Sequence, residues 1–104
     1  ELDPRHREAV RRLGNELNAV TGRIIIFGHT DDQPIRSFRF EDNVELSRAR
    51  AEGVRRILAQ TMKEPARMTL VGVGSAVPRY KPPDLPANRA RNRRVEILLQ
   101  KEQG

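Results

Sequence analysis

Two charged side chains have the types and positions to hold one ligand between them. Asp31 closely follows a short apolar run, residues 23–27, and open α/β sheets place ligands at the carboxyl ends of their strands. Arg50 lies four residues after Leu46 and four before Val54, so helical periodicity places it on the same face as those apolar residues. A half-buried arginine needs an anionic partner, and its planar fork suits a carboxylate. We therefore expect the acid and the arginine to form one site.

Each of these two residues also has a purely structural explanation. An isolated acid after a strand often accepts hydrogen bonds from a turn or a helix cap. Arg50 could pair internally with Asp31 or with another acid, and the pair would then only stabilise the fold. The sequence alone leaves both explanations open.

Other kinds of chemistry find little support in the sequence. His29 follows the apolar run, but the chain has only one further histidine, His6, in a separate predicted helix, so we predict no metal site. Ser47 and Ser75 lack the glycine elbow of a nucleophilic serine, and the chain has no cysteine. We predict a protein that is not an enzyme and that uses no cofactor.

The apolar pattern predicts the elements that position these residues. Asp3 and Pro4 form a helix start, and an apolar stripe ending at Val20 predicts a helix over residues 4–20. The nearly continuous apolar run at residues 23–27 is typical of a central strand buried on both faces. The other predicted elements are a helix from Asp42 or Asn43 to residue 60, a strand at 68–71, a short helix at 87–92 and a strand at 94–100.

This order predicts an α/β (α+β) two-layer sandwich, with helices packed on one face of a small mixed sheet. We expect residues 1–104 to form a single domain, because the length suits one core. The net charge of +6 favours a polyanionic partner such as nucleic acid, anionic lipid or an anionic wall polymer. No apolar run approaches the ~18 residues of a membrane span.

Three motifs together resemble the OmpA-like peptidoglycan-binding domain. They are Gly28-His29-Thr30-Asp31, then Asn43-x-x-Leu46-Ser47-x-x-Arg50-Ala51-x-x-Val54, then Asn92-Arg93-Arg94-Val95-Glu96-Ile97. Their order and spacing make the resemblance specific, and it extends over nearly the whole chain. The family has a β-α-β-α-β-α-β sandwich, which implies that its first strand would precede this sequence.

The resemblance implies a ligand and a set of binding residues. Domains of this family hold the peptide stem of peptidoglycan, without cutting it, by gripping meso-diaminopimelate. Asp31 would pair with the ammonium of that residue and Arg50 with its carboxylate. The further residues that the resemblance places near the pocket are Asn43 and Leu46 at the helix start, Arg94 in the last strand, and the backbone after Thr30.

The loop after Asp31 resembles that of one subfamily. Residues 31–40, with Arg36, Phe38 and Phe40, are similar to the loop of the type VI secretion inner-membrane proteins of the DotU/TssL class, and the flagellar stator protein MotB has a similar segment. The resemblance implies the periplasmic C-terminal domain of a Gram-negative inner-membrane protein. Its implied partners are peptidoglycan and other envelope secretion subunits, with the membrane reached only through a segment outside this sequence.

Some residues depart from the family pattern, and two rival functions remain. Val44 stands where family members commonly have tryptophan, and the smaller valine would shrink the wall of the pocket. Pro83, Leu85 and Asn88 also differ from the family pattern.

A structural or dimerisation module that has lost wall binding is one rival function, and such a module would form a homodimer. A nucleic-acid binder is the other, but only 4% of the residues are aromatic, so we predict no nucleic-acid partner.

Overall fold

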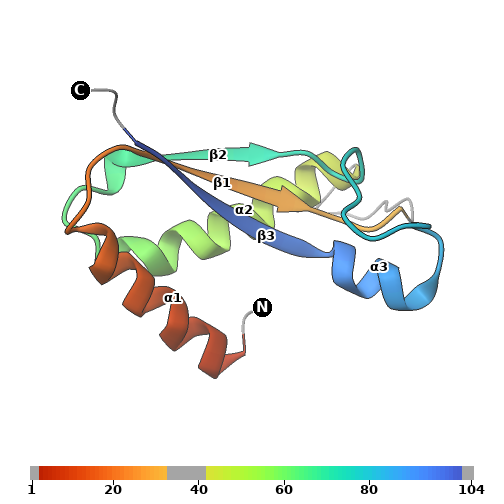
Figure 1. Cartoon of the computed structure of the whole chain (residues 1–104), viewed down its shortest axis with the longest axis horizontal. Coiled ribbons are helices and arrows are strands. Elements are labelled where there is room, and N and C mark those ends of the chain that lie inside the picture. Colours follow the sequence, from red (N-terminus) through yellow and green to blue (C-terminus); the bar gives the residue numbers. More distant parts are fainter. Residues whose placement is uncertain (1–2, 33–41, 102–104) are drawn as a thin grey trace.

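The computed structural model describes residues 3–32 and 42–101 of the chain. Helices and strands follow one another in the order shown in Figure 1. They are α1 (Pro4–Leu17), β1 (Arg23–His29), α2 (Asn43–Ala59), the 3-10 turn η1 (Pro65–Arg67), β2 (Met68–Gly72), α3 (Pro86–Asn92) and β3 (Arg94–Gln100). Every helix and strand predicted from the sequence is present, with shifts of one to three residues at some ends.

The three strands form one mixed sheet with β1 in the middle. Its order is β2-β1-β3, with β2 parallel and β3 antiparallel to β1. Ile26 lies opposite Leu70 on one side and Ile97 on the other. The predicted central strand and the strand-helix-strand crossover through α2 are confirmed, and so is the predicted fold class. Helix α2 runs behind the sheet in the view of Figure 1.

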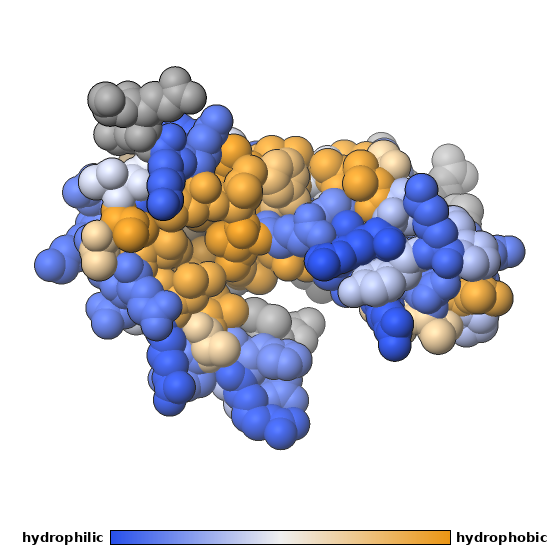
Figure 2. All heavy atoms as spheres, viewed as in Figure 1, coloured by the Kyte–Doolittle hydropathy of each residue, from blue (hydrophilic) through white to orange (hydrophobic). Residues whose placement is uncertain are grey.

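The core lies between α2 and one face of the sheet. Ile24 and Ile26 of β1 and Leu58 of α2 are fully buried there. Burial of each such side chain contributes roughly 1.5–3 kcal/mol. The opposite face, with Ile25 and Phe27, is only partly buried, so the prediction that β1 is buried on both faces was wrong for that face. Figure 2 shows apolar side chains gathered over the strands in this view, and hydrophilic ones around α3.

Helix α1 packs against the C-terminal part of α2. It begins at a cap in which Asp3 Oδ1 accepts a hydrogen bond from the Arg5 N–H at 2.8 Å. At Gly14, a Cβ atom would overlap Thr61 Oγ1, so only glycine allows this close approach. The helix ends at Leu17, and Val20, which the sequence placed on the apolar stripe, is 40% exposed in the turn that follows.

Helix α2 also approaches the sheet very closely, at its N-terminal half. A Cβ atom at Gly28 would overlap the Ser47 carbonyl oxygen, and one at Gly72 would lie 2.7 Å from the Val44 carbonyl oxygen. Asp42 caps this end of the helix by accepting a hydrogen bond from the Glu45 N–H at 2.9 Å. Glycine in both strands therefore lets the first turns of α2 lie against the strand ends.

Within residues 3–32 and 42–101, no helix combines the length and the apolar character that a membrane span requires.

We predict that Gly28→Ala destabilises the protein strongly, because the new methyl group meets helix backbone that cannot rotate away. The expected loss is about 1–3 kcal/mol or more in the free energy of unfolding, measured by urea denaturation. Gly53→Ala is the matched control, since a Cβ atom there meets nothing within 4 Å. It should stabilise α2 by roughly 0.5–1 kcal/mol. Equal stability of the two variants would show that α2 lies farther from β1.

Candidate functional site

Asp31 lies directly beyond the end of the central strand, and its neighbours hold its backbone. The Thr30 N–H donates to the Gly74 carbonyl oxygen at 2.9 Å, which continues the pairing with the chain after β2. Thr30 Oγ1 donates to the Asp31 carbonyl oxygen at 3.0 Å, and Asn43 Nδ2 lies 3.5 Å from the same oxygen. Thr30 and Asn43, both predicted at the site, therefore lie beside Asp31 and position its backbone.

The carboxylate of Asp31 forms an ion pair that the sequence analysis did not predict. Arg93 Nη1 lies 2.6 Å from Asp31 Oδ2, and the side chain of Asp31 is only 11% exposed while that of Arg93 is 44% exposed. Arg93 is the residue between α3 and β3. The sequence motif contained this arginine, but the next residue, Arg94, was assigned to the site instead.

Arg50 is half-buried on α2, as its position among apolar residues predicted. Burial lowers the pKa of its guanidinium most, the nearby charge of Arg93 lowers it further, and the charge of Asp31 raises it. Within the described ranges, Arg50 makes no hydrogen bond or ion pair of its own. Because an arginine keeps its charge throughout the physiological range, a cation stands near Asp31 without a close anionic partner in that part of the chain.

A second ion pair connects α3 to the residues after β1. Arg89 Nε lies 2.7 Å from Asp32 Oδ1, and both side chains are about one-third exposed or less. The hydrogen bond from Arg89 holds the pKa of the Asp32 carboxyl below its usual value. Arg89 and Arg93 thus attach α3 and its C-terminal end to the two consecutive acids, and this places α3 beside the candidate site.

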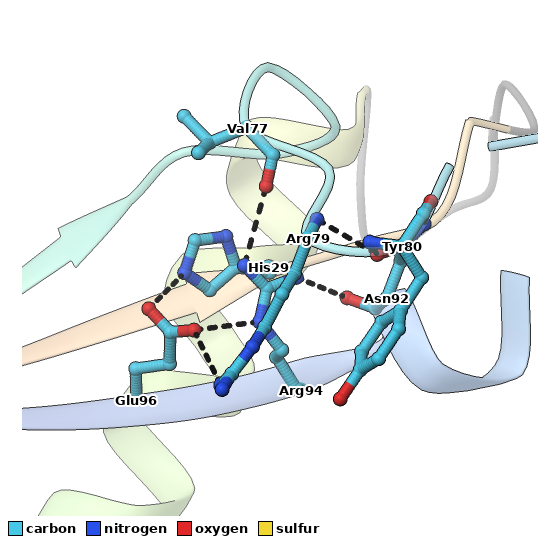
Figure 3. A network of polar contacts seen from close by, with 7 residues as sticks. All are labelled: His29, Val77, Arg79, Tyr80, Asn92, Arg94 and Glu96. Atoms are coloured by element: carbon cyan, nitrogen blue, oxygen red, sulfur yellow. Dashed lines mark hydrogen bonds and ion pairs between the residues drawn. The ribbon is translucent and has the colours of Figure 1, made fainter. Parts of the chain in front are cut away.

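Arg94 takes part in a different cluster on the open face of the sheet (Figure 3). Its Nε donates to Glu96 Oε2 at 2.8 Å, and its Nη2 donates to the Val77 carbonyl oxygen at 3.2 Å. His29 Nε2 lies 3.2 Å from Glu96 Oε1, and Arg79 Nη1 lies 3.7 Å from Glu96 Oε2. The prediction that Arg94 lies at the Asp31 site therefore needs correction, because its side chain is engaged with Glu96, and Arg93, the last residue before β3, is the arginine beside Asp31.

The first turns of α2 are fixed to the strand ends by Ser47. Its buried Oγ accepts a hydrogen bond from the Gly74 N–H at 3.0 Å and donates one to the Val44 carbonyl oxygen at 2.8 Å. Nothing in the sequence pattern predicted this structural role of Ser47. Leu46 is half-buried beside it, while Val44 is 51% exposed. The subfamily residues Arg36, Phe38 and Phe40 lie outside the described residues.

The arrangement is suited to electrostatic recognition. No group of three or more metal-ligating side chains that could hold an ion occurs within residues 3–32 and 42–101. A nearly buried carboxylate and a half-buried guanidinium lie on neighbouring elements at one end of the sheet. Such a pair can accept one cationic and one anionic group of the same ligand.

The chain belongs to the OmpA family, whose family model matches residues 1–93. It is similar to the cell wall anchor of the type VI secretion system from Pseudomonas aeruginosa, with 32% identity and a TM-score of 0.84 over 98% of this chain and 71% of that chain. It is also similar to the C-terminal domain of Helicobacter pylori MotB, with 27% identity and a TM-score of 0.86 over 98% of this chain and 77% of that chain.

Curated relatives extend well beyond this chain. The motility protein B of Helicobacter pylori is 35% identical over 92 residues, which cover 86% of this chain and 35% of that protein. An uncharacterised protein of Bacillus subtilis, YtxE, is 36% identical over 86 residues, or 82% of this chain and 35% of that protein. The chain thus spans about a third of the length of these relatives.

His29 is 3% exposed, and its position should make stability depend on pH. Burial lowers the pKa of His29 most, and Arg94 lowers it further, while Glu96 partly opposes the shift. Because the neutral ring must donate from Nε2 to the carboxylate, Nδ1 carries the lone pair, and it is buried without a hydrogen-bond partner among the described residues. A proton there would be poorly accommodated.

We predict that acidification destabilises the protein from the ordinary histidine pKa of 6.5 downward. The unfolded chain takes up the proton first, so the free energy of unfolding should fall as the pH drops below 6.5 toward the lowered pKa of the folded state. Glu96, whose pKa is held below 4.5, contributes only at lower pH. The profile of His29→Gln should be flatter, while that of His6→Gln, changed at an exposed position on α1, should match wild type. A wild-type slope in His29→Gln would contradict the assignment.

Proposed function

We propose that this domain binds peptidoglycan without cutting it, through the meso-diaminopimelate of the stem peptide. The observation that carries the proposal is the placement of the nearly buried Asp31 carboxylate and the half-buried Arg50 guanidinium at one end of the sheet. The distal end of diaminopimelate is a zwitterion, with an ammonium and a carboxylate on one carbon. Asp31 receives the ammonium and Arg50 receives the carboxylate, so the ligand is gripped at both charges.

The other proposed site residues support this pair. Thr30 and Asn43 hold the Asp31 carbonyl oxygen, and Leu46 lies half-buried on the turn of α2 before Arg50. Arg94 is engaged with Glu96 on the open face of the sheet, so we leave it out of the proposed ligand contacts. Recognition by charge and position needs no nucleophile or cofactor, and the proposed function is non-catalytic.

The larger role that we propose is to anchor an inner-membrane secretion complex of the type VI kind to the cell wall. Similarity to a protein described as the cell wall anchor of that system supports this role. The similarity to MotB supports a flagellar stator anchor as the second candidate. We propose for it a location in the periplasm of a Gram-negative cell, as the C-terminal part of a membrane protein, with peptidoglycan and other subunits of the same complex as its partners.

We predict that Asp31→Ala and Arg50→Ala each abolish binding of the tripeptide L-Ala-γ-D-Glu-meso-diaminopimelate, measured by isothermal titration calorimetry. Truncation of one member of the pair leaves a ligand charge without its partner, at a cost of roughly 2–5 kcal/mol of binding free energy. Arg48→Ala is the matched control, because Arg48 is an exposed arginine on the same helix, two residues away. It should bind like wild type.

Circular dichroism should show that both site variants remain folded, since Asp31 and Arg50 lie outside the apolar core. Wild-type affinity in either site variant, or no binding of the tripeptide by the wild-type protein, would contradict the proposal.

A further inference from the structure

Arg93 binds the carboxylate of Asp31, to which the ammonium of the proposed ligand would also bind. Its Nη1 lies 2.6 Å from Asp31 Oδ2, the distance of a strong charge-assisted hydrogen bond. A ligand ammonium bound to Asp31 must share this carboxylate with Arg93 or displace it. The arginine is thus part of the binding event, although the family resemblance gave it no role.

The backbone of Arg93 is fixed, while its side chain reaches solvent. The Arg93 N–H donates to the Arg89 carbonyl oxygen at 3.2 Å, as the last turn of α3 ends. The preceding residue, Asn92, is 1% exposed, and its side chain accepts hydrogen bonds from the N–H groups of Arg79 and Tyr80 at 3.0 Å and donates to the Tyr80 carbonyl oxygen at 3.1 Å. A backbone held by hydrogen bonds therefore carries a guanidinium that is partly exposed to solvent.

The ion pair itself is easily exchanged. The Arg93 side chain is 44% exposed, so water can hydrogen-bond to its guanidinium when it leaves Asp31. The Asp31 side chain is 11% exposed, so it stays in place while Arg93 can turn away. Arg93 can therefore leave Asp31 when a ligand cation takes its place at the carboxylate and the guanidinium finds another anion.

The two arginines near Asp31 determine which ligand charges the site can accommodate. Arg50 and Arg93 both lie close enough to Asp31 to interact with its charge, and the two cations repel each other. A ligand that brings only an ammonium takes over the carboxylate and leaves both guanidiniums without it. A ligand that also brings a carboxylate replaces the anion that they lose.

We infer that Arg93 is a specificity-determining residue, which exchanges Asp31 for the ligand carboxylate and so admits zwitterionic groups and rejects simple amines. This inference rests on the proposed function and adds a selection rule to it. The site then accepts stem peptides with diaminopimelate, whose distal carbon carries both charges. It rejects stems in which lysine replaces diaminopimelate, because the distal ammonium of lysine has no carboxylate beside it.

Two tripeptides that differ by this one carboxylate test the inference. They are L-Ala-γ-D-Glu-meso-diaminopimelate and L-Ala-γ-D-Glu-L-Lys, titrated by calorimetry into wild type, Arg93→Gln and Arg93→Lys. In Arg93→Gln, the affinity for the diaminopimelate peptide should fall about tenfold, because one charge-assisted contact is lost. The affinity for the lysine peptide should rise severalfold, because the ligand ammonium no longer competes with the Arg93 guanidinium for Asp31 Oδ2.

The control variants distinguish a specific role of Arg93 in ligand selection from a loss of folding and from the loss of one positive charge. Arg91→Gln removes the same charge from an exposed residue on α3, and it should leave the ratio of the two affinities unchanged. Arg93→Lys keeps the charge and should restore part of the ratio. Its thermal unfolding also verifies that the fold tolerates a change at this position.

Each outcome has a defined meaning. Opposite changes for the two peptides in Arg93→Gln support the inference. Parallel changes, or an unchanged ratio, overturn it while the proposed function stands. No binding of the diaminopimelate peptide by the wild-type protein overturns both.

Discussion

The whole arrangement depends on the close approach of α2 to the ends of β1 and β2. Gly28 and Gly72 remove the side chains that would keep the helix away, and the buried Ser47 bonds the helix to Gly74 after β2. This contact sets the position of Arg50, which lies one helical turn beyond Ser47, relative to the end of β1. Asp31 follows that same strand, so a packing constraint in the core fixes the separation of the two charges at the surface.

Two consecutive arginines at this end of the sheet make different contacts. Arg93 points to Asp31, while Arg94 points to Glu96 and His29 on the opposite face. The division falls where α3 ends and β3 begins, since Arg93 is the cap residue of the helix and Arg94 is the first residue of the strand. One arginine is thereby assigned to the proposed ligand site, and the other stabilises the strand that carries the site.

Much of this was predictable from the sequence, because periodicity reports local structure well. The apolar residues around Arg50 predicted its half-buried position, and the glycine-bounded run at residues 23–27 predicted the central strand. The partner of Asp31 was not predictable, because it depends on how α3 meets β3 and so on which of two adjacent arginines turns inward. The exposure of one face of β1 was not predicted for a similar reason. A run of apolar residues does not show whether another element covers both of its faces.

The most direct test of a ligand site at Asp31 and Arg50 is an NMR titration that observes the arginine side chains. The Nε–H resonances of the ¹⁵N-labelled protein would be followed during addition of the diaminopimelate tripeptide. The resonances of Arg50 and Arg93 should shift. Those of Arg94, bonded to Glu96, and of Arg67, bonded to the Gly22 carbonyl oxygen, should stay in place. Shifts confined to arginines other than Arg50 and Arg93, or no shifts, would contradict the account.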